Sequence, residues 1–177
     1  MSSPGTLYTV GHSNRDAPEF LELLRSHGVQ EVVDVRRYPG SRRNPQFGGE
    51  ALEATLADAG IGYTHMEALG GRRGRPAPDS PNTGWRVASF QAYADHMAEP
   101  EWLQALGALE ERAGQRAVAI MCSEAVPWRC HRRLIADALV VRGWDVRHIL
   151  GAGRSSPHEL QDFARVLPDA RIIYPGV

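Results

Sequence analysis

Short apolar runs alternate with amphipathic stretches along the whole chain. The segments Leu7–Val10, Val29–Val35 and Ala117–Met121 are rich in apolar residues, which is typical of parallel strands buried on both faces. The stretches between them carry apolar residues at helical spacing and end at glycine, as Gly28 and Gly60 do. The alternation predicts an α/β fold, a three-layer Rossmann-like sandwich with a mostly parallel sheet and 117–121 as its central strand.

The remaining elements follow from the same patterns. Three further strands are predicted at Tyr63–Met66, Trp144–Leu150 and Arg171–Tyr174, the last closing the sheet. Helices are predicted at Phe20–His27, Ala51–Ala59, Phe90–Met97, Cys130–Val141 and from Pro100 through Leu106. A capping box at Ser156–Glu159 predicts another helix through Leu167. Residues Leu69–Arg86 are rich in glycine and proline, and are expected to form a long loop of functional importance.

Length and composition restrict the class of protein. The 177 residues contain no repeat or linker, so we predict a single domain over residues 1–177. No apolar run approaches the roughly 20 residues that cross a bilayer, and no membrane partner is expected. Two cysteines are too few for a secreted disulfide scaffold, and the first ten residues do not resemble a signal peptide. We therefore expect a cytoplasmic protein.

The near-neutral charge conceals an uneven distribution. The formal charge is −1, and all 20 basic residues are arginines because the chain has no lysine. Half of these arginines fall in Arg36–Arg43, Arg72–Arg75 and Arg129–Arg133, which contain no acid. The rest of the chain has 10 arginines against 21 acids, a balance of −11. Three basic segments are thus set on an acidic body.

These three segments follow predicted strands. Because ligands of parallel sheets bind outside the carboxyl ends of the strands, the segments are expected to meet at one edge. The loops at that edge would be His12–Ser13, Arg36–Arg43, Leu69–Arg86, Cys122–Arg133 and Gly151–Ser156. Arginine pairs bidentately with phosphate, so the pattern predicts an anionic, phosphate-bearing ligand. The alternative is three solvated loops, each neutralised by nearby acids.

Asp34 and Glu124 are the candidate acid/base groups at this edge. A carboxylate among arginines stays ionised and can act as a base, although a structural ion pair of Asp34 with Arg36 explains that residue equally well. His12 precedes a predicted helix, which favours its neutral form and a role in proton transfer. Tyr38, Phe47, Trp85 and Trp128 lie near arginines in the sequence, a mixture suited to stacking a base.

Cys122 and Cys130 leave several roles open. Arg129 lies seven positions after Cys122, which departs from the C-x5-R loop of cysteine phosphatases. A metal site with His12 and His131 is an alternative, but zinc sites favour C-x2-4-C spacing. A buried, inert Cys122 is a further possibility. We predict no metal and no cofactor.

Four segments resemble a prokaryotic family, domain-of-unknown-function family 488. They are TVGHSNR at Thr9–Arg15, VVDVRRYPGSRRNPQF at Val32–Phe47, LGGRR at Leu69–Arg73 and MCSEAVPWRCHRRLIADAL at Met121–Leu139. The resemblance implies a small α/β fold with the motif residues gathered at one site, and it implies no particular reaction. The positions that match the motifs are Gly11, His12, Ser13, Asp34, Arg36, Ser41, Cys122, Glu124, Cys130, His131 and Arg132.

The leading hypothesis is an enzyme acting on a nucleotide or nucleic acid, as a hydrolase of a phosphoester or an N-glycosidic bond. DNA-base processing is one form of it. The expected catalytic residues are His12, Asp34, Glu124 and Cys122. The expected ligand-binding residues are Ser13, Arg36, Ser41, Arg42, Arg43, Gly70, Gly71, Arg72, Cys130, His131 and Arg132, with Arg36, Arg42 and Arg132 holding phosphate. The alternatives are a non-catalytic nucleotide or nucleic-acid-binding module, and a thiol-redox or metal-binding protein using Cys122 and Cys130. The sequence does not indicate the substrate or the oligomeric state.

Overall fold

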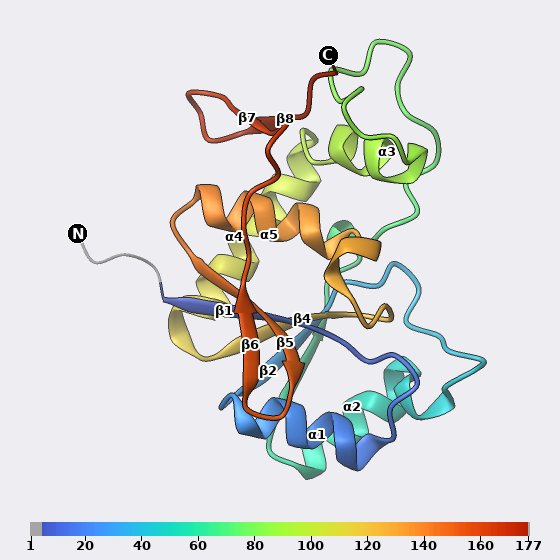
Figure 1. The fold of residues 1–177 in the computed structure, drawn as a ribbon. Helices are drawn as coiled ribbons and strands as arrows, with labels where there is room; N and C mark the ends of the chain where they lie inside the picture. The colour runs from blue at the N-terminus through green and yellow to red at the C-terminus, as the bar shows by residue number, and fades with distance from the viewer. Residues whose placement is uncertain (1–4, 177) are drawn as a thin grey trace.

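The computed structural model describes residues 5–176, which form a central six-stranded sheet covered by helices on both faces (Figure 1). The strands of this sheet are β1 (Thr6–Gly11), β2 (Glu31–Asp34), β3 (Gly62–His65), β4 (Val118–Cys122), β5 (Asp145–Gly151) and β6 (Arg154–Pro157). Their order is β3-β2-β4-β1-β5-β6. The first five strands are parallel, and β6 runs antiparallel to β5. The predicted mostly parallel sheet with a central 117–121 strand is confirmed.

Five helices complete the three layers. They are α1 (Ala17–Ser26), α2 (Gly49–Asp58), α3 (Ala88–His96), α4 (Pro100–Gln115) and α5 (Arg132–Val141). Helices α1 and α2 cover one face, and α4 and α5 cover the other, with α3 beyond them (Figure 1). The three-layer Rossmann-like sandwich is thus as predicted. None of the helices in the described residues is long and apolar enough to cross a membrane.

Local signals explain where helix α1 begins. The side chain of Asp16 accepts a hydrogen bond of 2.8 Å from the main-chain N–H of Glu19, which caps the helix. Pro18 occupies the first turn, where its missing N–H costs nothing. The apolar face of the helix then buries Phe20, Leu23 and Leu24 against the sheet.

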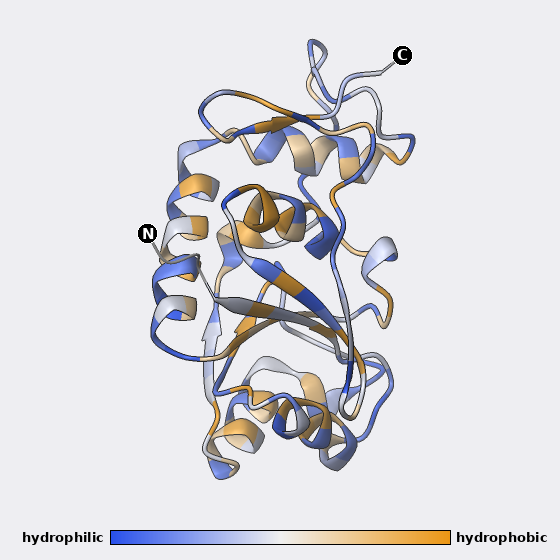
Figure 2. Ribbon diagram, turned by 60° about the vertical axis from the view of Figure 1, so that its left-hand side comes forward, coloured by the Kyte–Doolittle hydropathy of each residue, from blue (hydrophilic) through white to orange (hydrophobic). Residues whose placement is uncertain are grey.

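The two faces of the sheet divide the core. Val32, Ala119 and Met121 face the α1–α2 layer, whereas Val33 and Ile120 face α4 and α5. Strands β2 and β4 lie between the helical layers and are buried throughout (Figure 2). β4 is entirely apolar, as expected for a strand buried on both faces, whereas β2 also buries the carboxylates of Glu31 and Asp34.

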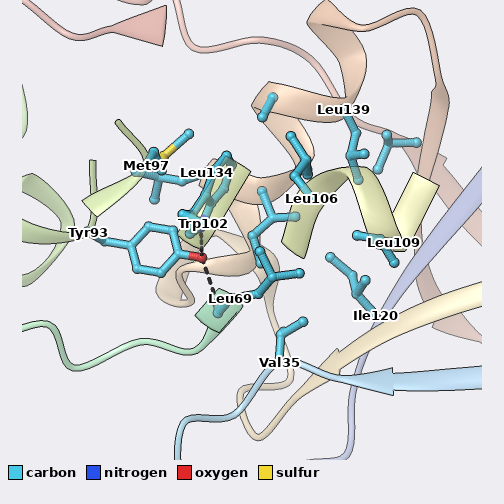
Figure 3. Close-up of a cluster of buried hydrophobic side chains, with 14 of the residues drawn as sticks. Val35, Leu69, Tyr93, Met97, Trp102, Leu106, Leu109, Ile120, Leu134 and Leu139 are labelled. Atoms are coloured by element: carbon cyan, nitrogen blue, oxygen red, sulfur yellow. Dashed lines mark hydrogen bonds between the residues drawn. The ribbon is translucent and has the colours of Figure 1, made fainter. Parts of the chain in front are cut away.

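An aromatic contact between α3 and α4 lies in the larger of the two core clusters. Trp102 donates a hydrogen bond of 2.9 Å to the Tyr93 hydroxyl, which donates at 2.6 Å to the main-chain oxygen of Leu69 (Figure 3). This contact holds the loop after β3 against the core.

The carboxyl-terminal region contradicts two predictions. No helix follows the capping box at Ser156–Glu159: residues up to Pro157 form β6, and 158–164 are irregular. Arg171–Tyr174 does not close the central sheet either, because β8 (Ile172–Ile173) pairs only with β7 (Arg165–Val166). The predicted loop Gly151–Ser156 is part of a β-hairpin: Gly151 ends β5, residues 154–156 belong to β6, and only Ala152 and Gly153 form the turn. Pairing with β5 extends to His158, whose N–H donates to the Val146 oxygen at 2.8 Å, and this tertiary pairing overrides the local helix signal.

The predicted long loop is confirmed. After a short 3-10 helix at Glu67–Leu69, residues 70–87 contain neither helix nor strand. The Asn82 side chain is buried and accepts a hydrogen bond from the N–H of Tyr174, and Gly84 N–H donates to the Tyr174 oxygen. The loop is therefore anchored to the carboxyl-terminal segment.

Candidate functional site

A cavity of about 370 Å³ opens at the carboxyl ends of β1, β2 and β4. This is the edge at which parallel sheets bind ligands. The lining residues are His12, Arg36, Arg37, Tyr38, Gly40, Ser41, Gly71, Arg72, Ser89, Phe90, Tyr93, Cys122, Ser123, Glu124, Arg129, Cys130 and His131.

The end of β1 is packed too tightly for any residue but glycine at position 11. Strand pairing continues past it, because His12 N–H donates to the Cys122 oxygen and Ser13 N–H to the Ser123 oxygen, both at 3.0 Å. A Cβ atom on Gly11 would lie 1.6 Å from the main-chain oxygen of Glu124. Gly11 thus brings the segment that carries His12 against the segment that carries Glu124.

Asp34 is fully buried beneath the cavity and does not line it. Its Oδ1 accepts from the main-chain N–H and Nε of Arg36, at 3.0 and 2.9 Å. Its Oδ2 accepts from Arg36 Nη2 at 2.7 Å and from the Tyr63 hydroxyl at 2.6 Å. Burial and the carboxylate raise the pKa of Tyr63, so the phenol stays a donor. The structural ion pair accounts for Asp34, and the expectation that it is an accessible catalytic base is not supported.

Arg36 is held by the protein in the same way. Besides Asp34, its Nη1 donates to the Phe47 oxygen at 2.7 Å and lies 3.4 Å from His12 Nε2. Arg36 therefore reaches the cavity wall as a fixed positive charge, with most of its donors already occupied.

His12 is a neutral imidazole whose unprotonated nitrogen lies near Arg36. Its Nδ1 lies 2.8 Å from the Ser13 oxygen, which can only accept, so the proton is on Nδ1 and Nε2 is the acceptor. The ring stacks on Phe47 with centroids 4.5 Å apart. Burial, and to a lesser degree the charge of Arg36, lowers the pKa of His12. His12 can accept a proton or a hydrogen bond.

Each of the three arginine segments contributes to the same cavity. Arg36 and Arg37 come from the first segment, Arg72 from the second and Arg129 from the third. Arg72 adopts a left-handed backbone with φ of 58°, and its oxygen accepts a hydrogen bond from Arg37 Nη1. Against these four arginines, the lining contains one carboxylate, that of Glu124. The cavity is strongly basic.

Two glycines allow close approach on the opposite wall. A Cβ atom on Gly70 would lie 2.5 Å from Cα of Arg37, and one on Gly71 would lie 3.0 Å from Nδ1 of His131. His131 donates from Nε2 to the Val35 oxygen at 2.7 Å, which leaves its Nδ1 as an acceptor. Burial lowers the pKa of His131 to about 4.

The cysteines meet at the junction of β4 and α5. Cys122 and Cys130 pair as a disulfide, with Cα atoms 7.4 Å apart. Arg132, which is fully buried, donates from Nη1 to Cys122 Sγ at 2.9 Å and to the Glu124 oxygen at 2.8 Å. Arg132 thus shapes the turn that presents Glu124, and it lies behind the cavity wall.

Glycine, histidine, cysteine and arginine from segments far apart in sequence therefore surround one cavity. The family model described as "Domain of unknown function DUF488" matches residues 16–139, which include every lining residue except His12. The chain belongs to the DUF488 family. Comparisons with curated proteins and with solved structures find no match. The resemblance noted in the sequence motifs is confirmed.

The DUF488 cavity brings together a majority of the residues singled out from sequence. His12, Arg36, Ser41, Gly71, Arg72, Cys122, Glu124, Cys130 and His131 line it. Asp34, Gly70 and Arg132 are buried behind the wall, and Ser13 lies beside it with a left-handed φ of 50°. Arg42 and Arg43 are exposed and do not line the cavity. The expected role of Arg42 and Arg132 in holding phosphate is therefore not supported, because neither residue lines the cavity.

Aromatic residues of the DUF488 site are only partly as expected. Tyr38 is 61% exposed and lines the cavity, and Trp128 is 58% exposed outside it. Phe47 and Trp85 are buried in packing contacts, so neither is available to stack a base. Phe90 and Tyr93 on α3 also line the cavity, and their sequence did not indicate this because their helical spacing is typical of core residues.

The cysteine–histidine metal site is not supported. Within residues 5–176, one group is close enough to share a cation, namely His96, Glu99 and Glu101, and it lies outside the DUF488 cavity. His96 Nε2 donates there to the Ala68 oxygen at 2.8 Å, so only Nδ1 faces the two exposed carboxylates.

Proposed function

We propose that this DUF488 protein is an enzyme that binds a phosphate-bearing ligand, a nucleotide or a short nucleic-acid segment, in the basic cavity and hydrolyses it. The observation that carries the proposal is the charge of the lining: Arg36 is ion-paired with buried Asp34, which leaves Arg37, Arg72 and Arg129 against the single lining carboxylate, Glu124. An electrically neutral ligand would leave this concentration of positive charge uncompensated, whereas a phosphate dianion neutralises it.

Arg72 and Arg129 are the arginines best placed to take the phosphate. Both are exposed, and the hydrogen bonds and ion pairs within residues 5–176 do not engage either guanidinium group. Arg36 adds a fixed charge from the cavity floor. Tyr38, whose ring lies 5.4 Å from the guanidinium carbon of Arg37, offers an exposed aromatic face for a base.

Glu124 is the candidate general base. It is the one carboxylate of the lining, it is exposed, and its main-chain oxygen is fixed by Arg132. A carboxylate in this position can activate water for attack on a phosphoester, or stabilise the cationic sugar that forms when an N-glycosidic bond breaks. The neutral His12 can accept a proton during either reaction.

Calorimetry with AMP and adenosine tests the binding step. We expect AMP to bind at low salt at least about tenfold more tightly than adenosine, because only AMP carries the phosphate. Arg129→Ser should remove most of this difference. Arg165→Ser, which removes an exposed arginine of β7 outside the cavity, is the matched control and should not. Equal affinities for AMP and adenosine would refute the proposed phosphate site.

Turnover distinguishes an enzyme from a binding module. Suitable substrates are aryl phosphate monoesters, aryl phosphate diesters and uracil-containing single-stranded DNA, which report phosphoester and N-glycosidic cleavage. Glu124→Gln should keep AMP binding and lower turnover by about 10²-fold or more, the usual contribution of a general base. Binding without turnover of any of these substrates would identify a non-catalytic module.

A further inference from the structure

A pair of cysteines that the proposed hydrolysis does not use lies in the cavity wall. Cys122 is the last residue of β4, and Cys130 lies two residues before the start of α5. Their side chains line the cavity but are only 2% and 4% exposed. What is exposed of either side chain lies on the cavity wall, so a disulfide that reacts with them has to approach through the cavity.

Arg132 is a buried cation that no carboxylate of residues 5–176 contacts in an ion pair, although the charge of Glu124 acts on it from farther away. Its donors face Cys122 Sγ and the main-chain oxygens of Glu124 and Ala125, and its Nε makes no hydrogen bond within the described residues. The ion pairs among residues 5–176 do not include it. Burial lowers the pKa of Arg132 to about 10, because the charged form is poorly solvated there. A thiolate on Cys122, 2.9 Å from Nη1, would supply the missing negative charge.

The sulfur of Cys130 has two polar neighbours of its own. The main-chain N–H of Arg132, at the start of α5, donates to Cys130 Sγ at 3.4 Å. His131 Nδ1, the unprotonated nitrogen of that ring, lies 3.6 Å from the same sulfur. The N–H donor stabilises the thiolate that forms when Cys130 reacts, and the weakly basic Nδ1 can accept a hydrogen bond from the thiol before it does.

We propose that Cys122 and Cys130 form a reversible dithiol–disulfide centre that exchanges with a low-molecular-weight disulfide entering the cavity. The Cys122 thiolate attacks one sulfur of the small disulfide, whose S–S bond breaks and releases one small thiolate. That small thiolate takes the proton of Cys130, and the Cys130 sulfur then attacks the Cys122 sulfur. The second small thiolate leaves. Overall, two protein sulfurs are oxidised and one small disulfide is reduced to one thiol and one thiolate.

Arg132 shifts the dithiol–disulfide equilibrium of this centre toward the dithiol. Oxidation removes the anion beside the buried guanidinium, so Arg132 stabilises the reduced pair and makes the disulfide easy to reduce. The proposal is independent of the phosphate site, because no phosphate-bearing ligand takes part in the exchange.

Equilibration of the full chain in mixtures of reduced and oxidised glutathione tests the centre. Acid quenching, alkylation and mass spectrometry measure the oxidised fraction. We expect reversible formation of one intramolecular disulfide, and in Cys130→Ser a single mixed disulfide with glutathione on Cys122. In Arg132→Gln, the midpoint should move at least about tenfold toward lower oxidised glutathione. Arg133→Gln, which removes the neighbouring arginine that contacts Trp128 and Gln161, is the matched control and should leave the midpoint unchanged.

Three results would overturn the proposal: a pair that stays reduced in every mixture, a disulfide that resists excess reduced glutathione, or an unchanged midpoint in Arg132→Gln. If Arg132→Gln fails to fold, the ultraviolet absorbance of thiolate in the reduced native protein decides. The proposal requires one thiolate at pH 7. Its appearance only near pH 8.5, the ordinary thiol pKa, would contradict it.

Discussion

At the scale of single residues, the cavity depends on side chains and glycines that fix its shape without entering it. Asp34 is such a residue: its two carboxylate oxygens are occupied by Arg36 and Tyr63. Both roles considered for Asp34 fit the sequence, because an acid two positions from an arginine has the same spacing in a catalytic site and in an ion pair. Only the burial of the pair distinguishes them. At Gly11, the space available excludes any residue that has a Cβ atom.

Gly11→Ala should destabilise the protein strongly. The new Cβ would overlap the Glu124 oxygen, so β1 and the 122–124 turn must separate. We expect a loss of about 1–3 kcal/mol or more in the free energy of unfolding, measured by urea denaturation. Gly107→Ala is the control: it lies inside α4 with nothing within 4 Å of its Cβ, and should stabilise by about 0.5–1 kcal/mol. Equal effects of the two substitutions would contradict the close contact at Gly11.

At the scale of elements, the β1–β5 strands and the five helices could be predicted, because each carries its own apolar period and stop signal. The carboxyl-terminal region could not. Ser156–Glu159 has the local form of a helix start, yet a chain of buried hydrogen bonds decides its structure. Hydrogen bonds join Thr9 to His148 at 2.6 Å, His148 to His158 at 2.8 Å, and His158 to Asp137 at 2.6 Å. The partners lie far apart in sequence, so no local pattern reveals them. The helix α3 itself was predicted, but its contribution to the cavity wall was not, because tertiary packing alone places Phe90 and Tyr93 there.

Tyr174→Phe should loosen the carboxyl-terminal segment. The Tyr174 hydroxyl donates to Asp137 Oδ2 at 2.8 Å, and its removal leaves a buried carboxylate oxygen short of a donor. We expect a loss of about 1–3 kcal/mol. Amide hydrogen exchange should accelerate at His158 and Gly84 and stay unchanged in α1. Tyr8→Phe is the control, because the Tyr8 hydroxyl makes no hydrogen bond within residues 5–176, and it should change neither quantity. Faster exchange spread evenly over the chain would argue against a local anchor.

At the scale of the whole molecule, stability is coupled to pH through buried neutral histidines. Burial lowers the pKa of His131 to about 4 and, with the charges of His158 and Arg132, that of His148 to about 3. An unfolded histidine has a pKa of about 6.5. The stabilising contribution of each is therefore complete above pH 6.5 and is lost as the pH falls toward the folded-state value.

Between pH 6.5 and pH 5, these two histidines should together cost roughly 3 kcal/mol of unfolding free energy: the slope for each rises from about half of 1.4 kcal/mol per pH unit at pH 6.5, where the unfolded histidine is half protonated, to nearly all of it at pH 5. Urea unfolding at several pH values measures the slope. His148→Gln should reduce the slope by about half. A stability that is constant or rises on acidification over this range would show that the histidines are not buried in neutral form.

The acidic body and the basic cavity are also a property of the whole molecule. Sequence composition gave a near-neutral total, and only the position of the arginine segments at the strand ends revealed their convergence. That convergence was predictable from topology, whereas which arginines face the cavity was not, because it depends on the turns after β2 and β4. The guanidinium groups of Arg36 and Arg132 are engaged in contacts within the protein, whereas Arg72 and Arg129 are exposed and line the cavity.

The most direct test of the account is a crystal structure of the protein with AMP. The account predicts that the phosphate lies in the cavity, in contact with the guanidinium groups of Arg72 and Arg129, with the base toward Tyr38 and Glu124 beside the bound nucleotide. Clear density for AMP at a different place on the molecule, or an empty cavity at saturating AMP, would contradict it.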